Sequence, residues 1–137
     1  RLTAVFDSVG ERSRDFAAKH GIEAYTDLDE FLARGPIDAV TVATPTGLHA
    51  SVAIPSARAG KHVLCEKPLH AEPAWVKRAF DAAERAERLL MEAFMYRHHT
   101  DNAQWLGVAR GGELGQIHQV RVALSFTGRP PAAFDRQ

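Results

Sequence analysis

The chain has 137 residues, the size of one domain, and 45% of them are hydrophobic, so it can bury a core. Lysine and arginine together number 17, as do aspartate and glutamate, which argues against nucleic acid or a membrane surface as partner. No apolar run approaches the roughly 18 residues of a membrane span, and no signal pattern opens the chain. The single cysteine, Cys65, agrees with a reducing compartment, and we expect a cytoplasmic protein.

Both ends of the sequence look cut. Arg1 leads at once into an apolar run that looks like the middle of a strand, without an initial methionine. Residues 129–137 have the composition of a loop. We therefore expect this chain to be an internal piece of a longer protein.

Short apolar runs alternate with stretches of helical periodicity, which is typical of βαβ units around a parallel sheet. Gly21 is placed to end one helix, residues 26–29 have the spacing of a capping box, and residues 37–43 predict a strand buried on both faces. The predicted elements up to residue 65 are strands at 2–7, 37–43 and 61–65, a short extended piece at 22–25, and helices at 11–20, 30–34 and 49–59.

The second half continues this alternation and then changes. Glu72 and Pro73 open a long helix, whose stripe toward the sheet comprises Val76, Ala79, Phe80, Ala83 and Glu87. A strand is predicted at 89–95 and a helix from Asp101 or Asn102 to Gly111. In residues 119–126 the apolar period becomes two, as in a strand with one buried face. We place a domain boundary near Gly112.

Polar residues gather where the predicted parallel strands end, which is where ligands bind in open α/β sheets. Asp7 could hold the ribose hydroxyls of a dinucleotide or cap the following helix, and its segment alone does not decide. Lys67 is directed by Pro68 and could polarise a substrate oxygen, although its spacing alone favours a solvated Glu-Lys pair. Arg97 is either a surface residue or a cofactor contact.

Two further groups of residues predict neither a metal site nor a ligand-stacking site. His98 and His99 diverge as neighbours and lack a Cys or acidic partner at ligand spacing, so no metal is predicted. Trp75, Trp105 and Phe80 are more simply explained by core or interface packing than by stacking on a ligand.

Three ordered segments carry a resemblance to a known family. They are 43–50 (ATPTGLHA), 59–69 (AGKHVLCEKPL) and 91–99 (MEAFMYRHH), and they resemble the glucose-fructose oxidoreductase / inositol dehydrogenase / rhizopine catabolism (Gfo/Idh/MocA) family. The resemblance runs from Leu2 to about Phe126. It implies an α/β fold, with an incomplete Rossmann-type parallel sheet at 1–112 that lacks its first strand and glycine-rich loop. Residues 113–137 would begin a second, mostly antiparallel α/β domain for substrate and oligomer contacts, so the parent protein would be a homo-oligomer.

The resemblance also implies roles for single residues. Lys67 would take part in catalysis, and Ser8 favours NAD over NADP, although Arg12 could still reach a 2'-phosphate. The implied cofactor-binding residues are Asp7, Ser8, Arg12, Thr44, Pro45, His49, Glu66, Lys67 and Arg97. His70 stands where the family usually has a small residue.

The resulting hypothesis is hydride transfer between NAD(P) and a sugar, inositol or related diol or carbonyl. One alternative is a non-catalytic nucleotide-binding or regulatory relative, and another is a truncated product without activity. The glycine-rich loop and the family's downstream Asp/His segment do not occur in this sequence. We therefore expect no turnover by the purified 137-residue chain, and measurable nicotinamide reduction would contradict this.

Overall fold

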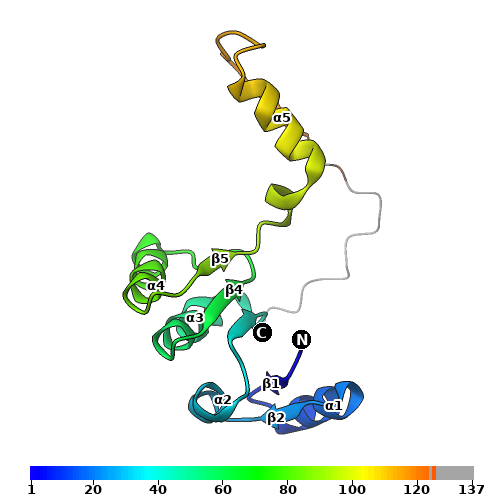
Figure 1. The fold of residues 1–137 in the computed structure, drawn as a ribbon, viewed down its shortest axis with the longest axis vertical. Helices are drawn as coiled ribbons and strands as arrows, with labels where there is room; N and C mark the ends of the chain where they lie inside the picture. Colours follow the sequence, from blue (N-terminus) through cyan, green and yellow to red (C-terminus); the bar gives the residue numbers. More distant parts are fainter. Residues whose placement is uncertain (124, 126–137) are drawn as a thin grey trace. The chain divides into compact units, whose positions relative to one another are not determined.

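Apolar and β-branched segments form short strands, and helices connect them in the computed structural model, which describes residues 1–123 and 125. The chain divides into two units, Arg1–Met95 and Tyr96–Gln137 (Figure 1). The elements of the first unit are β1 (Ala4–Phe6), α1 (Gly10–His20), β2 (Glu23–Tyr25), α2 (Leu28–Arg34), β3 (Ala39–Val42), η1 (Thr46–Leu48), α3 (His49–Arg58), β4 (His62–Cys65), α4 (Pro73–Arg85) and β5 (Leu90–Glu92).

The strands form two parallel sheets, which confirms the predicted α/β class. One sheet has the order β1-β2, and the other has the order β3-β4-β5. Val42 pairs with Cys65 and Cys65 with Glu92, so the carboxyl ends of β3, β4 and β5 lie side by side. Within the described residues, β1 has a strand neighbour only in β2 and β3 only in β4. Both strands line one cavity of about 910 Å³.

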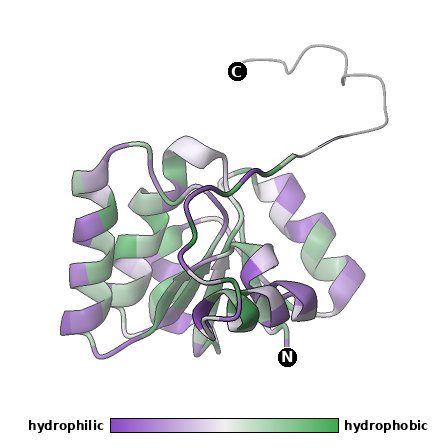
Figure 2. Cartoon of the chain, turned by 90° about the horizontal axis from the view of Figure 1, so that it is seen from above, coloured by the Kyte–Doolittle hydropathy of each residue, from purple (hydrophilic) through white to green (hydrophobic). Residues whose placement is uncertain are grey.

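Small side chains let α3 and α4 pack closely on one face of β3-β4-β5 (Figure 1). Val42 and Cys65 from the sheet, Ala57 from α3 and Ala79 from α4 are all nearly inaccessible to water. Hydrophobic residues fill the central strands in Figure 2, while hydrophilic ones lie along the outer sides of the helices. Burial of a side chain as large as that of Val42 stabilises the fold by roughly 1.5–3 kcal/mol, and burial of an alanine methyl by less.

The other face of β3 differs from the prediction. Val40 and Val42 are buried, but Ala39 and Thr41 are exposed, so the expectation of a strand buried on both faces was wrong for the described chain. The reason is that Ala39 and Thr41 line the open cavity instead of packing beneath a helix. Their neighbours on this face, Leu64 and Met91, are also exposed.

The helix ends follow local chemistry, with one correction. Gly21 ends α1 in the left-handed region with φ of 64°, and Pro73 is at the start of α4, as predicted. The cap of α2 is Asp27, not Thr26, because the Asp27 carboxylate accepts a hydrogen bond from the Glu30 N–H at 2.8 Å.

The apolar stripe of α4 is also narrower than predicted. Phe80 is 44% exposed, and Glu87 lies beyond the helix with a φ of 55°. Ala79, Ala82 and Ala83 form the buried stripe instead, because close helix packing accepts alanine and leaves the larger Phe80 at its border. Trp75 packs partly buried against the core, as predicted.

The second unit contains most of η2 (Met95–His98) and all of α5 (Thr100–Arg110). The N-cap position of α5 is His99, whose side chain makes no cap hydrogen bond, while Asp101 and Asn102 lie inside the helix. The Asn102 side chain donates to the Tyr96 carbonyl at 2.6 Å. Trp105 is 70% exposed, so it is not core within the described residues. Among residues 1–123 and 125, no helix is long and apolar enough to cross a membrane.

The predicted strand at 119–126 does not form in residues 119–123, where Val120 and Val122 are 75% and 88% exposed. A strand needs a partner for its backbone groups, and the described residues offer none there. Leu124 and Phe126 lie outside the described residues. The predicted domain boundary near Gly112 stays a prediction.

Candidate active site at the carboxyl ends of the strands

Residues that follow β1 and β3 line the same cavity. Asp7 and Ser8 follow β1, Thr44 and Pro45 follow β3, and Arg12 comes from the first turns of α1. All five line the cavity, together with apolar residues of both strands. The structure therefore brings together five of the nine residues that the resemblance implies for cofactor binding.

Asp7 does not cap α1, since the N-cap of that helix is Val9 and no side chain bonds there, while its contact with a ribose stays a prediction. Its Oδ1 accepts a hydrogen bond from the Val9 N–H at 2.8 Å, which shapes the turn into α1. The other carboxylate oxygen has no partner within residues 1–123 and 125 and lies at the cavity. Ser8 and Arg12 are exposed beside it, and Arg12 forms no ion pair in the described part of the chain. These groups fit the hydroxyls of a ribose.

Thr44 provides the most specific sign of a ligand. Its hydroxyl oxygen is buried and has no hydrogen-bond partner among the described residues. Leaving a buried hydroxyl unsatisfied costs about 1–3 kcal/mol, so such a group calls for an explanation. A nucleotide cofactor in the cavity would supply that partner, and the side chains present fit such a group.

Backbone groups on both sides of Lys67 are hydrogen-bonded to three other parts of the fold. The Glu66 N–H donates to the Val42 carbonyl at 2.9 Å, which extends the β3-β4 ladder. The Pro68 carbonyl lies 2.8 Å from Nδ1 of His49, and the Leu69 N–H donates to Oε1 of Glu92 at 2.8 Å. Lys67 and Glu66 have exposed side chains, and no described residue bonds the Lys67 ammonium group.

His49 lies inside the protein and not on the cavity wall. Its ring is 2% exposed, with Nδ1 near the Pro68 carbonyl and Nε2 2.8 Å from the Thr44 carbonyl. It therefore connects the loop after β3 with the loop after β4. Its contact with a cofactor stays a prediction.

Glu92 was missed by the sequence reasoning. It ends β5, where its carboxylate supports Leu69 beside Lys67. An acidic residue within the apolar run 89–95 was the available signal, since such a charge needs a partner. Glu92 also helps to raise the pKa of the Cys65 thiol to about 11, although burial of Cys65 is the larger cause and Glu66 contributes least. Cys65 is therefore a neutral, unreactive core residue.

Arg97 lies in η2 of the second unit, and its contact with a cofactor stays a prediction. His99 is next to Asp101, with 3.7 Å between Nδ1 and Oδ2. Within the described residues, no three His, Cys, Asp or Glu side chains are grouped to hold a metal ion.

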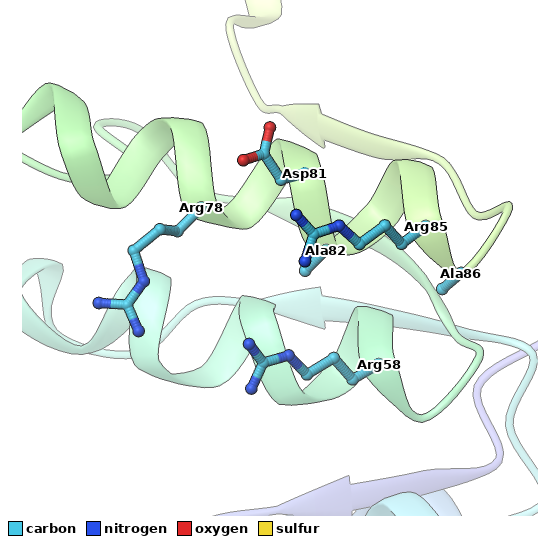
Figure 3. A pocket seen from close by; sticks show the side chains of 6 residues that line it. All are labelled: Arg58, Arg78, Asp81, Ala82, Arg85 and Ala86. Carbon is cyan, nitrogen blue, oxygen red and sulfur yellow. The ribbon is translucent and has the colours of Figure 1, made fainter.

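A second hollow of about 360 Å³ lies between α3 and α4 and contains three arginines, Arg58, Arg78 and Arg85 (Figure 3). Arg58 and Arg85 are the last residues of their helices, where positive charge is favourable. Arg78 lies over the Trp75 ring at 4.3 Å. Because α3 ends where the chain enters β4, this hollow is near the amino ends of the strands and not near Lys67.

Comparison with known proteins decides the family. The profile of the GFO_IDH_MocA family, described as "Oxidoreductase family, NAD-binding Rossmann fold", matches residues 1–94. The chain belongs to this oxidoreductase family. The recognition from the three sequence segments is confirmed.

Matches to individual proteins support the same conclusion. It is 32% identical to myo-inositol 2-dehydrogenase of Thermotoga maritima over 98% of this chain and 41% of that protein. The structure of the WlbA dehydrogenase from Bordetella pertussis, in complex with NADH and UDP-GlcNAcA, matches with a TM-score of 0.79 and 30% identity, over 85% of this chain and 34% of that one.

The structure of KijD10, a 3-ketoreductase from Actinomadura kijaniata in complex with NADP and TDP-benzene, matches with a TM-score of 0.72 and 36% identity. That match covers 82% of this chain and 34% of that one. The 137-residue chain thus spans 41% or less of the length of each of these three relatives.

Proposed function

We propose that the complete protein transfers a hydride between a nicotinamide cofactor and a carbinol or carbonyl carbon of a sugar, inositol or related diol. The observation that carries the proposal is the Lys67 segment, whose backbone is bonded on three sides while its ammonium group has no partner among the described residues. Such a group can be aimed at a ligand without first breaking an ion pair. Family membership supplies the reaction class.

Lys67 would act on the oxygen of the substrate. An ammonium group donates a hydrogen bond to that oxygen and stabilises negative charge as it develops. A backbone held on three sides also limits the positions of the side chain, which helps to orient the reacting carbon.

The cofactor, when bound, supplies or accepts the hydride at its nicotinamide ring. Asp7 and Ser8 would hold the ribose of the adenosine, and Arg12 could approach a 2'-phosphate. The remaining residues proposed to bind the cofactor are Thr44, Pro45, His49, Glu66, Lys67 and Arg97. Ser8 favours NAD, while relatives in this family have been solved with NADH and with NADP. A cytoplasmic location and a homo-oligomeric parent belong to the same proposal.

The experiment that tests this function is a substrate screen with the complete protein. Free sugars, inositols and nucleotide-linked sugars would be mixed with NAD or NADP, and reduced nicotinamide would be followed by its absorbance. We expect turnover with at least one polyol or sugar. Tight cofactor binding without turnover of any of these compounds would contradict the proposal and favour a regulatory relative.

A further inference from the structure

The hollow between α3 and α4 gathers three arginines that the proposed hydride transfer does not use. Arg58 comes from α3, and Arg78 and Arg85 come from α4. In Figure 3 the Arg78 side chain points toward α3, and those of Arg58 and Arg85 extend over the space between the two helices. Within residues 1–123 and 125, none of the three forms an ion pair. These residues define the arginine hollow.

The arginine hollow keeps a surplus of positive charge. Among the described residues that line it, only Asp81 carries a carboxylate. Both oxygens of that carboxylate are already bonded to Nζ of Lys77, at 2.8 and 2.7 Å. Figure 3 shows the Asp81 carboxylate directed away from Arg58. Because like charges repel one another, an anion placed between the three guanidinium groups would be bound favourably.

Arg78 is held in place by an aromatic ring. Its Cζ lies 4.3 Å from the centroid of the Trp75 ring, and Trp75 packs against the core and lies 5.4 Å from the His70 ring. Stacking uses the flat face of a guanidinium group, while its five N–H donors lie in the plane. The edge of Arg78 is therefore available to a ligand, and its position is fixed before the ligand binds, which reduces the entropy lost on binding.

The ends of the two helices do not account for the cluster. Arg58 and Arg85 are the last residues of α3 and α4, where a positive charge complements the free carbonyls. However, side chains on a helix lean toward its amino end, and Figure 3 shows both of these running back along their helices. Their guanidinium groups are thus directed away from the terminal carbonyls and toward Arg78.

Two other arginines of the same unit have the structural partners that these three lack. Arg34 pairs with Glu30 at 3.0 Å, and Arg88 donates to the Gly60 carbonyl at 2.6 Å. Neither of them lines the arginine hollow. An exposed arginine without a partner is common by itself, so the evidence for a site is the gathering of three in one hollow.

The donors and the size of the arginine hollow favour a compact phosphate. A guanidinium group offers two parallel N–H donors that match two oxygens of a phosphate. Three such groups from different directions suit tetrahedral phosphates better than one planar carboxylate. The volume of about 360 Å³ exceeds that of a single ion and lies in the range of small-molecule sites, roughly 300–1,000 Å³. With 17 basic and 17 acidic residues, the chain has no wider basic field for a long polyanion.

We propose that the arginine hollow binds a small phosphorylated anion of the pyrophosphate type. Arg78 is the fork that is already in place, and Arg58 and Arg85 bind the anion from the ends of the two helices. The described residues that line this hollow and those that line the cavity assigned to the cofactor have no member in common. The proposal therefore rests neither on Lys67 nor on hydride transfer.

The site is tested by calorimetric titration of the complete protein with pyrophosphate at an ionic strength of roughly 0.15 M. NAD or NADP, whichever binds more tightly, is present at saturation so that the cofactor site is filled. We expect pyrophosphate to bind, and Arg58→Gln and Arg78→Gln each to raise its Kd about 10-fold or more, since each removes a charged donor. Arg34→Gln removes the same charge from α2 and is the matched control, which should keep the Kd. Absence of binding at this ionic strength would overturn the proposal.

Two further measurements separate the arginine hollow from other causes of binding. The Kd of the cofactor should be unchanged in Arg58→Gln and Arg78→Gln, and a variant that weakens the cofactor as much as pyrophosphate would overturn a second site. Arg78→Lys keeps the charge but not the fork, so it should bind pyrophosphate nearly as weakly as Arg78→Gln. Citrate is the competing carboxylate probe. If citrate binds as tightly as pyrophosphate, the hollow recognises charge alone and the assignment to phosphate is wrong.

Discussion

Replacement of Thr44 by valine should act in opposite directions on folding and on cofactor binding. Valine has nearly the shape of threonine and removes the buried hydroxyl, which has no partner among the described residues. Removing an unsatisfied buried polar group should raise the free energy of unfolding without cofactor by about 1–3 kcal/mol. If the cofactor supplies the missing hydrogen bond, the variant should lose about 0.5–1.5 kcal/mol of binding, or roughly 2- to 10-fold in Kd.

The assay is urea unfolding of the complete protein with and without NAD, combined with calorimetric titration of the cofactor. Thr46→Val is the matched control, because Thr46 lies exposed in the same loop and should change both quantities by less than about 0.5 kcal/mol. A Thr44→Val protein that is no more stable without cofactor, and whose Kd is unchanged, would refute this reasoning. That result would mean that another part of the protein already satisfies the hydroxyl.

Two further predictions concern the supports of the Lys67 segment and the core. Glu92→Gln keeps an oxygen that can accept a hydrogen bond from the Leu69 N–H, so it should retain most activity. Glu92→Ala removes that acceptor and should lower kcat roughly 10-fold or more. Equal kcat values in the two variants would contradict a role of Glu92 in holding this segment. Because the pKa of the Cys65 thiol is raised from 9.0 to about 11, the folded state holds this proton more tightly than the unfolded chain. Its contribution to stability should be complete below pH 9.0 and disappear as the pH rises toward about 11, a loss that Cys65→Ala should remove from the unfolding curves.

Much of the fold could be predicted because it depends on local patterns. Gly21 and Pro73 mark helix ends by their own backbone preferences, and the apolar run before Glu66 identifies a strand whatever surrounds it. The exposed side of β3 could not be predicted in this way. Whether Thr41 is covered depends on segments that pack beside it, and composition does not contain that information.

In the candidate site too, local patterns predicted some residues, while contacts between distant segments were not predicted. Asp7, Thr44 and Lys67 were predicted because each follows a strand, and parallel strands place their carboxyl ends at one edge. The bonds of His49 and Glu92 were not predicted, because they join segments 19 and 23 residues apart in sequence. Such contacts depend on the register of β3, β4 and β5 and become visible only in the folded chain.

The central claim, that Lys67 polarises the substrate oxygen, is tested most directly by single-turnover hydride transfer in Lys67→Ala of the complete protein. We expect the rate to fall at least about 100-fold, as when a donor to a developing oxyanion is removed, and the affinity for the cofactor to change far less. Lys77→Ala, which breaks only an exposed ion pair with Asp81, should transfer hydride at the normal rate. Hydride transfer by Lys67→Ala at the rate of the unaltered protein would contradict the account.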